Sequence, residues 1–207
     1  MEKLKVLDLF SGIGGFTLGL ERAGMQTVAF CEIDSFCLYI LRKHWPNILQ
    51  FRSVQHLTVE RLQKHNIEKV DVICGGFPCQ DISIMGKDTG LLGSRSGLWF
   101  EYLRIIKEVR PSWVIIENVD ALRFRGLEQD TDFRSTISSW GWRGKEDLQQ
   151  IYDDPFGEFY SWPKPLLCRV DDGVSYRMDR LKCLGNAIVP QIAELIGKQI
   201  LKSISND

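Results

Sequence analysis

Apolar, strand-like segments alternate with helix-like segments through the first 120 residues of the chain. In chain order, these segments are Lys5 to Leu9, Gly15 to Ala23, Thr27 to Glu32, Ser35 to Lys43, Val70 to Cys74, Leu98 to Val109 and Trp113 to Glu117. Strands that alternate with helices are typical of a parallel sheet wrapped by helices. The pattern therefore predicts an α/β fold with a mostly parallel sheet and helices on both faces.

The ends of the predicted strands carry most of the residues that could do chemistry. Right-handed crossovers place these strand ends along one edge of a parallel sheet, and open α/β sheets bind ligands at that edge. Asp8, Glu32, the turn that leads to Cys79, and Glu117 all lie at or just beyond strand ends. We therefore expect them to share one site.

Two other segments differ from this alternation. Asp81 to Gly97 contains four glycines and no sustained period, which predicts a long loop, either a closing lid or a surface excursion. Ala187 to Ile204 has a helical stripe of apolar residues, which predicts a C-terminal helix packed on the sheet. The stripe consists of residues 188, 192, 195, 196, 200 and 204.

Composition narrows the class of protein. With 207 residues, 44% of them hydrophobic, the chain is long enough for one domain, or one and a small appendage. A net charge of -1 gives no general attraction to polyanions, so binding of nucleic acid requires a local basic surface. The six cysteines show no zinc-site spacing, which predicts reduced thiols and no metal. No segment is apolar enough for a signal peptide or a membrane span, so we expect a soluble, cytoplasmic protein.

The glycine-rich stretch after the first strand is typical of a turn that binds a nucleotide-like cofactor. Gly12 and Gly14 let the backbone approach a ligand, but Thr17 stands where a dinucleotide fingerprint requires a third glycine. Glu32 follows Gly12 by 20 residues and is placed to bind ribose hydroxyls. An adenosine ligand without a required pyrophosphate cradle fits best; a tight turn without a ligand is the alternative.

Cys79 and Glu117 pair a nucleophile with an acid. Cys79 follows an apolar strand and the turn Gly75 to Pro78, while Glu117 ends the next predicted strand. A thiol and a carboxyl that face one cleft suit attack on an electron-poor ring. A cysteine at a strand end that serves only packing is the alternative.

Taken together, these motifs resemble the DNA (cytosine-5) methyltransferase family. The resemblance covers about residues 4–122 and 162–204. It is carried by Asp8 to Phe16, Glu32-Ile33-Asp34, Gly75 to Ser83, Arg95 to Trp99, Glu117-Asn118-Val119, Arg180-Leu181 and Gly185 to Gln191.

The resemblance implies a Rossmann-like fold that uses S-adenosyl-L-methionine and acts on cytosine in double-stranded DNA. It implies that Cys79 adds to carbon 6 of a flipped cytosine while Glu117 contacts ring nitrogen 3, with Pro78 and Asn118 beside them. The implied cofactor contacts are Asp8, Phe10, Ser11, Gly12, Gly14, Gly15, Glu32, Ile33, Pro78, Leu98, Asn186 and Ala187. The implied DNA contacts are Gln80, Ser83, Arg95, Arg123 and Arg125.

The chain departs from the family pattern after the Glu-Asn-Val motif. Further strands, an arginine motif and most of the target-recognition region are not found, and Ser53 stands near a place where a carboxylate is common. We expect a core over residues 1–122, a reduced recognition or linker segment over 123–165, and a C-terminal segment that returns to the core over 166–207.

Three functions stay open on the sequence. The first is an active methyltransferase that reads few bases, as part of restriction-modification. The second is a shortened module that binds cofactor, DNA or both without turnover, and the third is a tRNA cytosine methyltransferase. A monomer is expected, and whether a restriction-modification partner exists is left open.

Overall fold

The computed structural model describes residues 2–77, 97–117 and 188–205 of the chain. In chain order, the elements of these residues are β1 (Lys5–Leu9), α1 (Gly15–Ala23), β2 (Gln26–Cys31), α2 (Ser35–His44), β3 (Leu49–Phe51), η1 (Val54–His56), α3 (Val59–Gln63), β4 (Val72–Gly75), α4 (Gly97–Val109), β5 (Trp113–Ile116) and α8 (Pro190–Ser205). η1 is a 3₁₀ helix.

Five parallel strands form one sheet in the order β3-β2-β1-β4-β5. From β1 the chain winds outward to β2 and β3, and then crosses back to β4 and β5 on the other side of β1. The strand order therefore reverses between β1 and β4, and ligands bind at the carboxyl end of such a switch point. The predicted α/β fold with a parallel sheet is confirmed.

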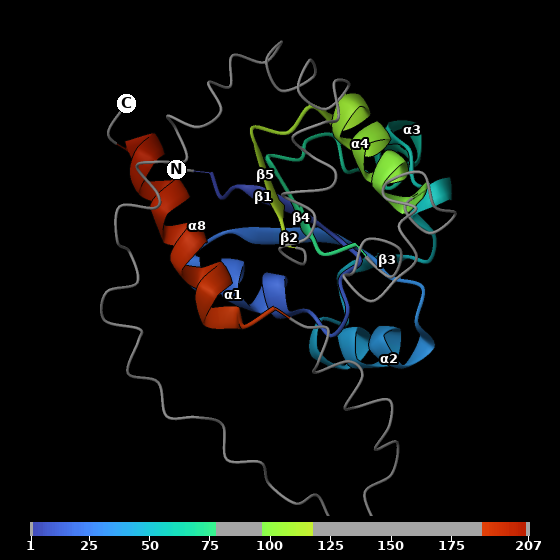
Figure 1. Cartoon of the computed structure of the whole chain (residues 1–207), viewed down its shortest axis with the longest axis horizontal. Coiled ribbons are helices and arrows are strands. Elements are labelled where there is room, and N and C mark those ends of the chain that lie inside the picture. Colours follow the sequence, from blue (N-terminus) through green and yellow to red (C-terminus); the bar gives the residue numbers. More distant parts are fainter. Residues whose placement is uncertain (1, 78–96, 118–187, 206–207) are drawn as a thin grey trace, which may run out of the picture.

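Helices cover both faces of the sheet (Figure 1). On one face, α1 and α8 bury Phe16, Leu20 and Ala193 against residues of β1 and β4, including Val6 and Cys74. On the other face, α3 and α4 pack with Leu7, Leu9 and Ile73 into the larger apolar cluster. The alternation of side chains along each strand supplies both cores, as a doubly covered parallel sheet requires.

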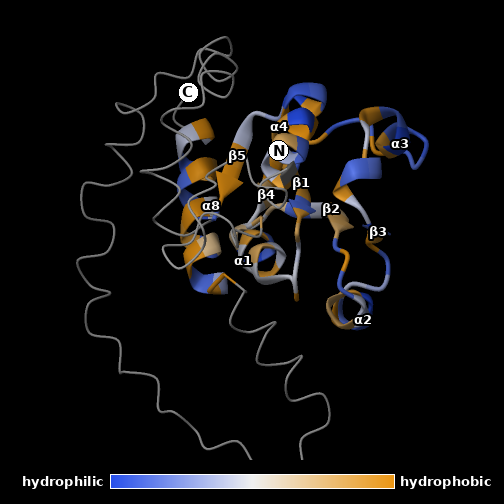
Figure 2. Ribbon diagram, turned by 45° about the vertical axis from the view of Figure 1, so that its right-hand side comes forward, coloured by the Kyte–Doolittle hydropathy of each residue, from blue (hydrophilic) through white to orange (hydrophobic). Residues whose placement is uncertain are grey.

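Helices α1 and α8 pack closely through small residues. A Cβ atom on Gly197 would lie 2.7 Å from Cβ of Ala23, and one on Gly19 would lie 2.6 Å from Cβ of Ala193. Figure 2 shows hydrophobic and hydrophilic stripes along α8. Helix α8 therefore holds the C-terminal part of the chain on the first helix.

The predicted stripe on the C-terminal helix is only partly right. Ala193, Gly197 and Ile200 are the buried residues of α8, whereas Ile192 is 38% exposed. The helix packs on α1 as well as on the sheet, and close helix packing selects small residues that hydropathy does not emphasise.

Three short elements between β2 and β4 were not predicted. Strand β3 has three residues with Gln50 at its centre, and η1 and α3 have three and five residues. Segments this short carry too few periods to be recognised. The expected boundaries at residues 122 and 165 lie outside the described residues and stay predictions. Within the described ranges, no helix has the length and apolar character needed to cross a membrane.

Candidate active site

The turn between β1 and α1 has an unusual backbone. Phe10, Gly12 and Gly14 have φ angles of 51°, 54° and 85°, so every second residue of the turn is left-handed. Alternation of this kind makes the turn concave, although the N–H groups of Ser11, Gly12 and Gly14 are bonded within the protein. The N-terminus of α1 follows directly and adds the positive end of its dipole.

Ser11 fixes this turn to the two strands beneath it. Its hydroxyl donates to the Asp8 carbonyl at 2.6 Å and accepts from the Cys31 N–H at 3.2 Å. Its own N–H donates to the Cys31 carbonyl at 3.3 Å. The uncharged Ser11 side chain therefore anchors the turn on β1 and β2.

Glu32 follows β2 and holds the tip of the same turn. One carboxylate oxygen accepts from the Gly12 N–H at 2.7 Å, and the other accepts from the Asp34 N–H at 2.7 Å. Each carboxylate oxygen has a second lone pair, so Glu32 can still accept from hydroxyl donors. Next to it, Ile33 is 75% exposed and offers an apolar surface for a flat ring. These residues fit an adenosine group.

Asp8 supports the turn from within the core. Its side chain is fully buried and accepts from the Thr17 hydroxyl at 2.7 Å, while Thr27 donates to Thr17 at 3.2 Å. The other oxygen, Oδ1, has no hydrogen-bond partner of normal length among the described residues. Desolvation by burial raises the pKa of Asp8 to about 7, despite the opposing effect of Thr17. Thr17 thus uses the position of the third fingerprint glycine for a hydroxyl that binds Asp8.

Trp45 contacts the turn from the side of α2, a contact that sequence reasoning missed. Its indole N–H donates to Glu21 at 2.8 Å, and its ring would lie 2.6 Å from a Cβ on Gly14. Gly14 therefore excludes a side chain for two reasons, its positive φ angle and this ring. A tryptophan just beyond a helix gives no sequence signal for such a contact.

The strand that leads toward Cys79 leaves the sheet between the turn and Glu117. A Cβ on Gly75 would overlap the Leu9 carbonyl oxygen, and one on Gly76 would lie 2.5 Å from Oε2 of Glu117. The Glu117 N–H donates to the Gly75 carbonyl at 3.2 Å. At Gly75, where a Cβ would meet fixed backbone, only glycine allows this close approach. The segment before Cys79 and the carboxyl of Glu117 are therefore neighbours.

The Glu117 side chain is exposed enough to meet a ligand. Partial desolvation nevertheless raises its pKa above the usual range for glutamate. A raised pKa favours the protonated form, which can donate to a ring nitrogen.

The start of α8 also reaches this edge. The Ile188 carbonyl oxygen would lie 2.6 Å from a Cβ on Gly15, the first residue of α1. Ile188 directly follows Ala187, so the C-terminal motif returns beside the cofactor turn. Leu98, on the first turn of α4, packs against the larger apolar cluster.

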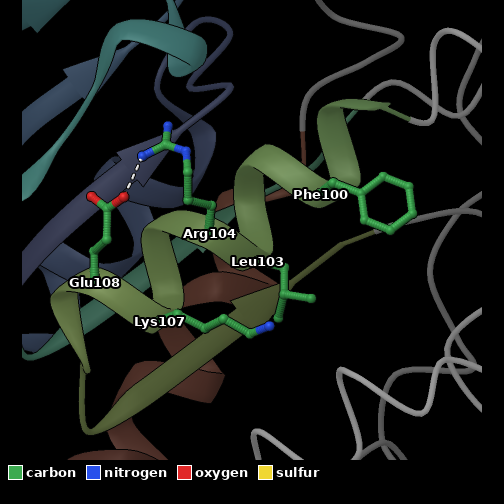
Figure 3. A pocket seen from close by; sticks show the side chains of 5 residues that line it. All are labelled: Phe100, Leu103, Arg104, Lys107 and Glu108. Atoms are coloured by element: carbon green, nitrogen blue, oxygen red, sulfur yellow. Dashed lines mark hydrogen bonds and ion pairs between the residues drawn. The ribbon is translucent and has the colours of Figure 1, made fainter.

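A separate hollow of about 350 Å³ lies on the outer side of α4 (Figure 3). Arg104 and Glu108 form an ion pair of 2.8 Å on its wall. None of its lining residues was expected in the site, and we assign it no role. It is lined by Phe100, Leu103, Arg104, Lys107 and Glu108.

Comparison with known families decides the identity of this arrangement. The model of the C-5 cytosine-specific DNA methylases matches residues 4–139, about two thirds of the chain. The chain belongs to this family. The resemblance inferred from the motifs is thereby confirmed.

Curated type II methyltransferases match only over part of their length. The type II methyltransferase M.HgiBI of Herpetosiphon aurantiacus is 37% identical over 186 residues, which are 89% of this chain and 38% of the relative. M2.BsuMI of Bacillus subtilis is 38% identical over 120 residues, which are 56% of this chain and 29% of the relative. The chain thus spans less than half the length of these relatives.

Solved structures agree with the fold. A candidate DNA modification methyltransferase encoded within an E. coli prophage is 30% identical, with a TM-score of 0.53 over 66% of this chain and 37% of that one. The Entamoeba histolytica methyltransferase EhMeth, at 16% identity and a TM-score of 0.54 over 67% of this chain and 44% of that one, supports the fold alone. The Rossmann-like methyltransferase fold is therefore shown.

Several predicted site residues lie outside the described residues, and their roles stay predictions. They are Pro78, Cys79, Gln80, Ser83, Arg95, Asn118, Arg123, Arg125, Asn186 and Ala187. Of the cysteines, Cys31, Cys37 and Cys74 are buried and form no disulfide among the described residues. Within the described ranges, no group of three or more potential metal ligands occurs.

The burial of Asp8 predicts a pH-dependent stability. Because the pKa rises from 3.8 to about 7 on folding, the folded state keeps a proton that the unfolded state loses over this interval. The stabilising contribution of Asp8 is therefore complete at low pH and falls by up to about 4 kcal/mol as the pH rises through 7. The Asp8→Asn variant does not titrate at this position. Between pH 5 and pH 8, urea denaturation should therefore show the free energy of unfolding of the wild type falling relative to that of the variant. A constant difference would contradict a raised pKa.

Gly75 and Gly76 should respond differently to the same substitution. A Cβ on Gly75 meets fixed backbone and the residue has a φ angle of 152°, so Gly75→Ala should lower the free energy of unfolding by about 2 kcal/mol or more. A Cβ on Gly76 meets the end of the flexible Glu117 side chain. Gly76→Ala should therefore cost less than about 1 kcal/mol, because the carboxylate can move aside. Equal losses in thermal denaturation would show that the two glycines face similar constraints.

Proposed function

We propose that this protein transfers a methyl group from S-adenosyl-L-methionine to carbon 5 of a cytosine flipped out of double-stranded DNA. The proposal is supported above all by the approach of Gly76, three residues before Cys79, to the Glu117 carboxyl. Family membership and the fit of the β1 turn to an adenosine group support it independently. The matching family model is that of DNA methylases, and one solved relative is named a DNA modification methyltransferase, which favours DNA over tRNA as the substrate.

Four parts of the site would hold the cofactor. Glu32 accepts from the ribose hydroxyls while it keeps the Gly12 N–H, and Ile33 covers one face of the adenine. The N-terminal N–H groups of α1 would receive the carboxylate of the amino-acid part, because the N–H groups of Ser11, Gly12 and Gly14 are bonded within the protein. Phe10 and Leu98 would contact the cofactor between its adenosine and amino-acid parts. Asn186 and Ala187, in the C-terminal motif, are the remaining expected contacts. When bound, the cofactor supplies a methyl group on a positively charged sulfur.

The residues of the chain perform the remaining steps on the cytosine. Cys79, as thiolate, adds to carbon 6 and moves electron density to carbon 5. Glu117, whose raised pKa favours the protonated form, donates to nitrogen 3 and stabilises the charge that develops on the ring. After methylation, removal of the proton on carbon 5 allows the Cys79 sulfur to leave. Pro78 and Asn118 hold these two residues in place.

The DNA contacts remain those that the motifs imply. Gln80 and Ser83 follow the nucleophile, and Arg95, Arg123 and Arg125 bind phosphates or the flipped base. Flipping costs a few kcal/mol, which these contacts must offset. We further propose that the protein acts as a monomer within a restriction-modification system.

A cofactor-binding module without turnover is the second candidate, because the chain spans only 29% to 38% of the relatives cited above. Such a module would keep the turn, Glu32 and α8, all of which the structure describes. The two candidates share cofactor binding and differ in the chemistry of Cys79.

Cofactor binding is tested by calorimetric titration with S-adenosylhomocysteine. We expect measurable heat with the wild type and an affinity about 10- to 100-fold lower in Glu32→Ala, because both the ribose contacts and the hold on Gly12 are lost. Glu60→Ala, at an exposed glutamate on α3, is the matched control and should bind normally. Absence of heat with the wild type would exclude both candidates.

Covalent capture separates the two candidates. DNA that contains 5-fluorocytosine, incubated with S-adenosyl-L-methionine, should give an adduct that survives denaturing electrophoresis, because fluorine blocks the release of Cys79. The adduct should disappear in Cys79→Ala and persist in Cys37→Ala, which alters a buried cysteine of α2. Binding of cofactor without an adduct on any duplex tested would support the module. Capture on tRNA alone would support the third function.

A further inference from the structure

Tyr102 on α4 contacts all three segments that the proposed site brings together. The side chain is 0% exposed and belongs to none of the expected site residues. Its contacts run to the cofactor turn, to the strand before Cys79, and to the strand before Glu117. The proposed chemistry gives Tyr102 no role.

The first contact is with Phe10 in the cofactor turn. The two rings are nearly parallel, at an interplanar angle of 8° and a centroid distance of 6.1 Å. Phe10 is not a glycine and yet has a φ angle of 51°. A left-handed residue that is not glycine is strained and persists only where its surroundings fix it. The ring of Tyr102 is one of these surroundings.

The second contact is with Phe77, two residues before Cys79. The ring centroids of Phe77 and Tyr102 lie 6.3 Å apart. Trp99, also 0% exposed, stands 5.4 Å from Phe77 and 6.3 Å from Tyr102, and closes the group. Aromatic pairs at these separations contribute beyond the area that they bury. The position of Phe77 is therefore set by α4.

The third contact is with β5. The Tyr102 hydroxyl donates to the Ile115 carbonyl oxygen at 3.5 Å, two residues before Glu117. Burial raises the pKa of Tyr102 well above its usual value, so the hydroxyl stays a donor at neutral pH. One side chain thus joins the turn, the nucleophile strand and the strand of the acid.

We propose that Tyr102 is a positioning residue that couples occupation of the cofactor turn to the placement of Cys79. A ligand that orders the turn around Phe10 changes the packing of Tyr102, and Phe77 transmits this change to the segment that continues to Cys79. This inference rests on the proposed function, because it assumes that the turn binds the cofactor.

The experiment measures the alkylation rate of Cys79 by iodoacetamide, resolved by peptide mass spectrometry, with and without saturating S-adenosylhomocysteine. In the wild type, the ligand should change this rate by about fivefold or more. In Tyr102→Leu the effect should vanish while the affinity for S-adenosylhomocysteine stays within about fivefold of the wild type. Tyr102→Phe keeps the ring and should keep most of the effect.

Leu62→Ala controls for loss of core volume, since Leu62 on α3 is buried in the same apolar cluster. It should lower the melting temperature and leave the ligand effect on Cys79 intact. In turnover assays, Tyr102→Leu should lower kcat by about 10-fold or more with little change in KM for the cofactor. If Tyr102→Leu only reduced the fraction of folded protein, kcat would equal that of the wild type once it is divided by the amount of Cys79 that covalent capture detects.

The outcomes distinguish the two proposals. A wild type that does not bind S-adenosylhomocysteine would refute the proposed function. Binding with an equal ligand effect in the wild type and in Tyr102→Leu, or with no effect on Cys79 in either, would refute the role of Tyr102 alone. Loss of the effect in Leu62→Ala as well would reduce Tyr102 to ordinary packing.

Discussion

The structure depends on how closely the chain leaves β1 and β4 at the same edge of the sheet. Gly75 lies against the Leu9 carbonyl, with no room for a side chain, and Gly76 lies against the Glu117 side chain. A reversal of strand order makes a crevice, but here the crevice is narrowed until three loops touch. The cofactor turn, the segment before Cys79 and Glu117 are therefore in direct contact, so that a displacement of one of them displaces the others.

Two carboxylates shape this edge in opposite ways. Glu32 is partly buried and satisfies two backbone N–H groups, so it fixes the tip of the turn and keeps lone pairs for a ligand. Asp8 is enclosed and bonded to Thr17, so it ties β1 to α1 and gives the turn a rigid base. Neither is paired with a cation in the described residues, which leaves the concave turn as the positively polarised feature of the site.

Much of the fold follows from the sequence because its strands are apolar runs that end in glycine turns or acidic residues. Glu32 and Glu117 could be placed at one edge from connection rules alone, and their neighbours Gly12 and Gly76 confirm it. Strand β3 could not be predicted, since three residues centred on Gln50 show no period. The contacts of Trp45 and Tyr102 could not be predicted either, because they depend on how residues on and after helices pack against the turn and the sheet, for which the local pattern has no signal.

The packing of α8 on α1 has a consequence for the length of the chain. Glu117 and Ile188 are both fixed at the carboxyl edge, the first by β5 and the second by Gly15, so the 70 residues between them connect two anchored points. The entropy of closing such a connection grows only logarithmically, by about 0.6 kcal/mol for each doubling of its length. A connection between these two points can therefore be shortened or extended at little entropic cost while the turn around the first helix keeps its geometry.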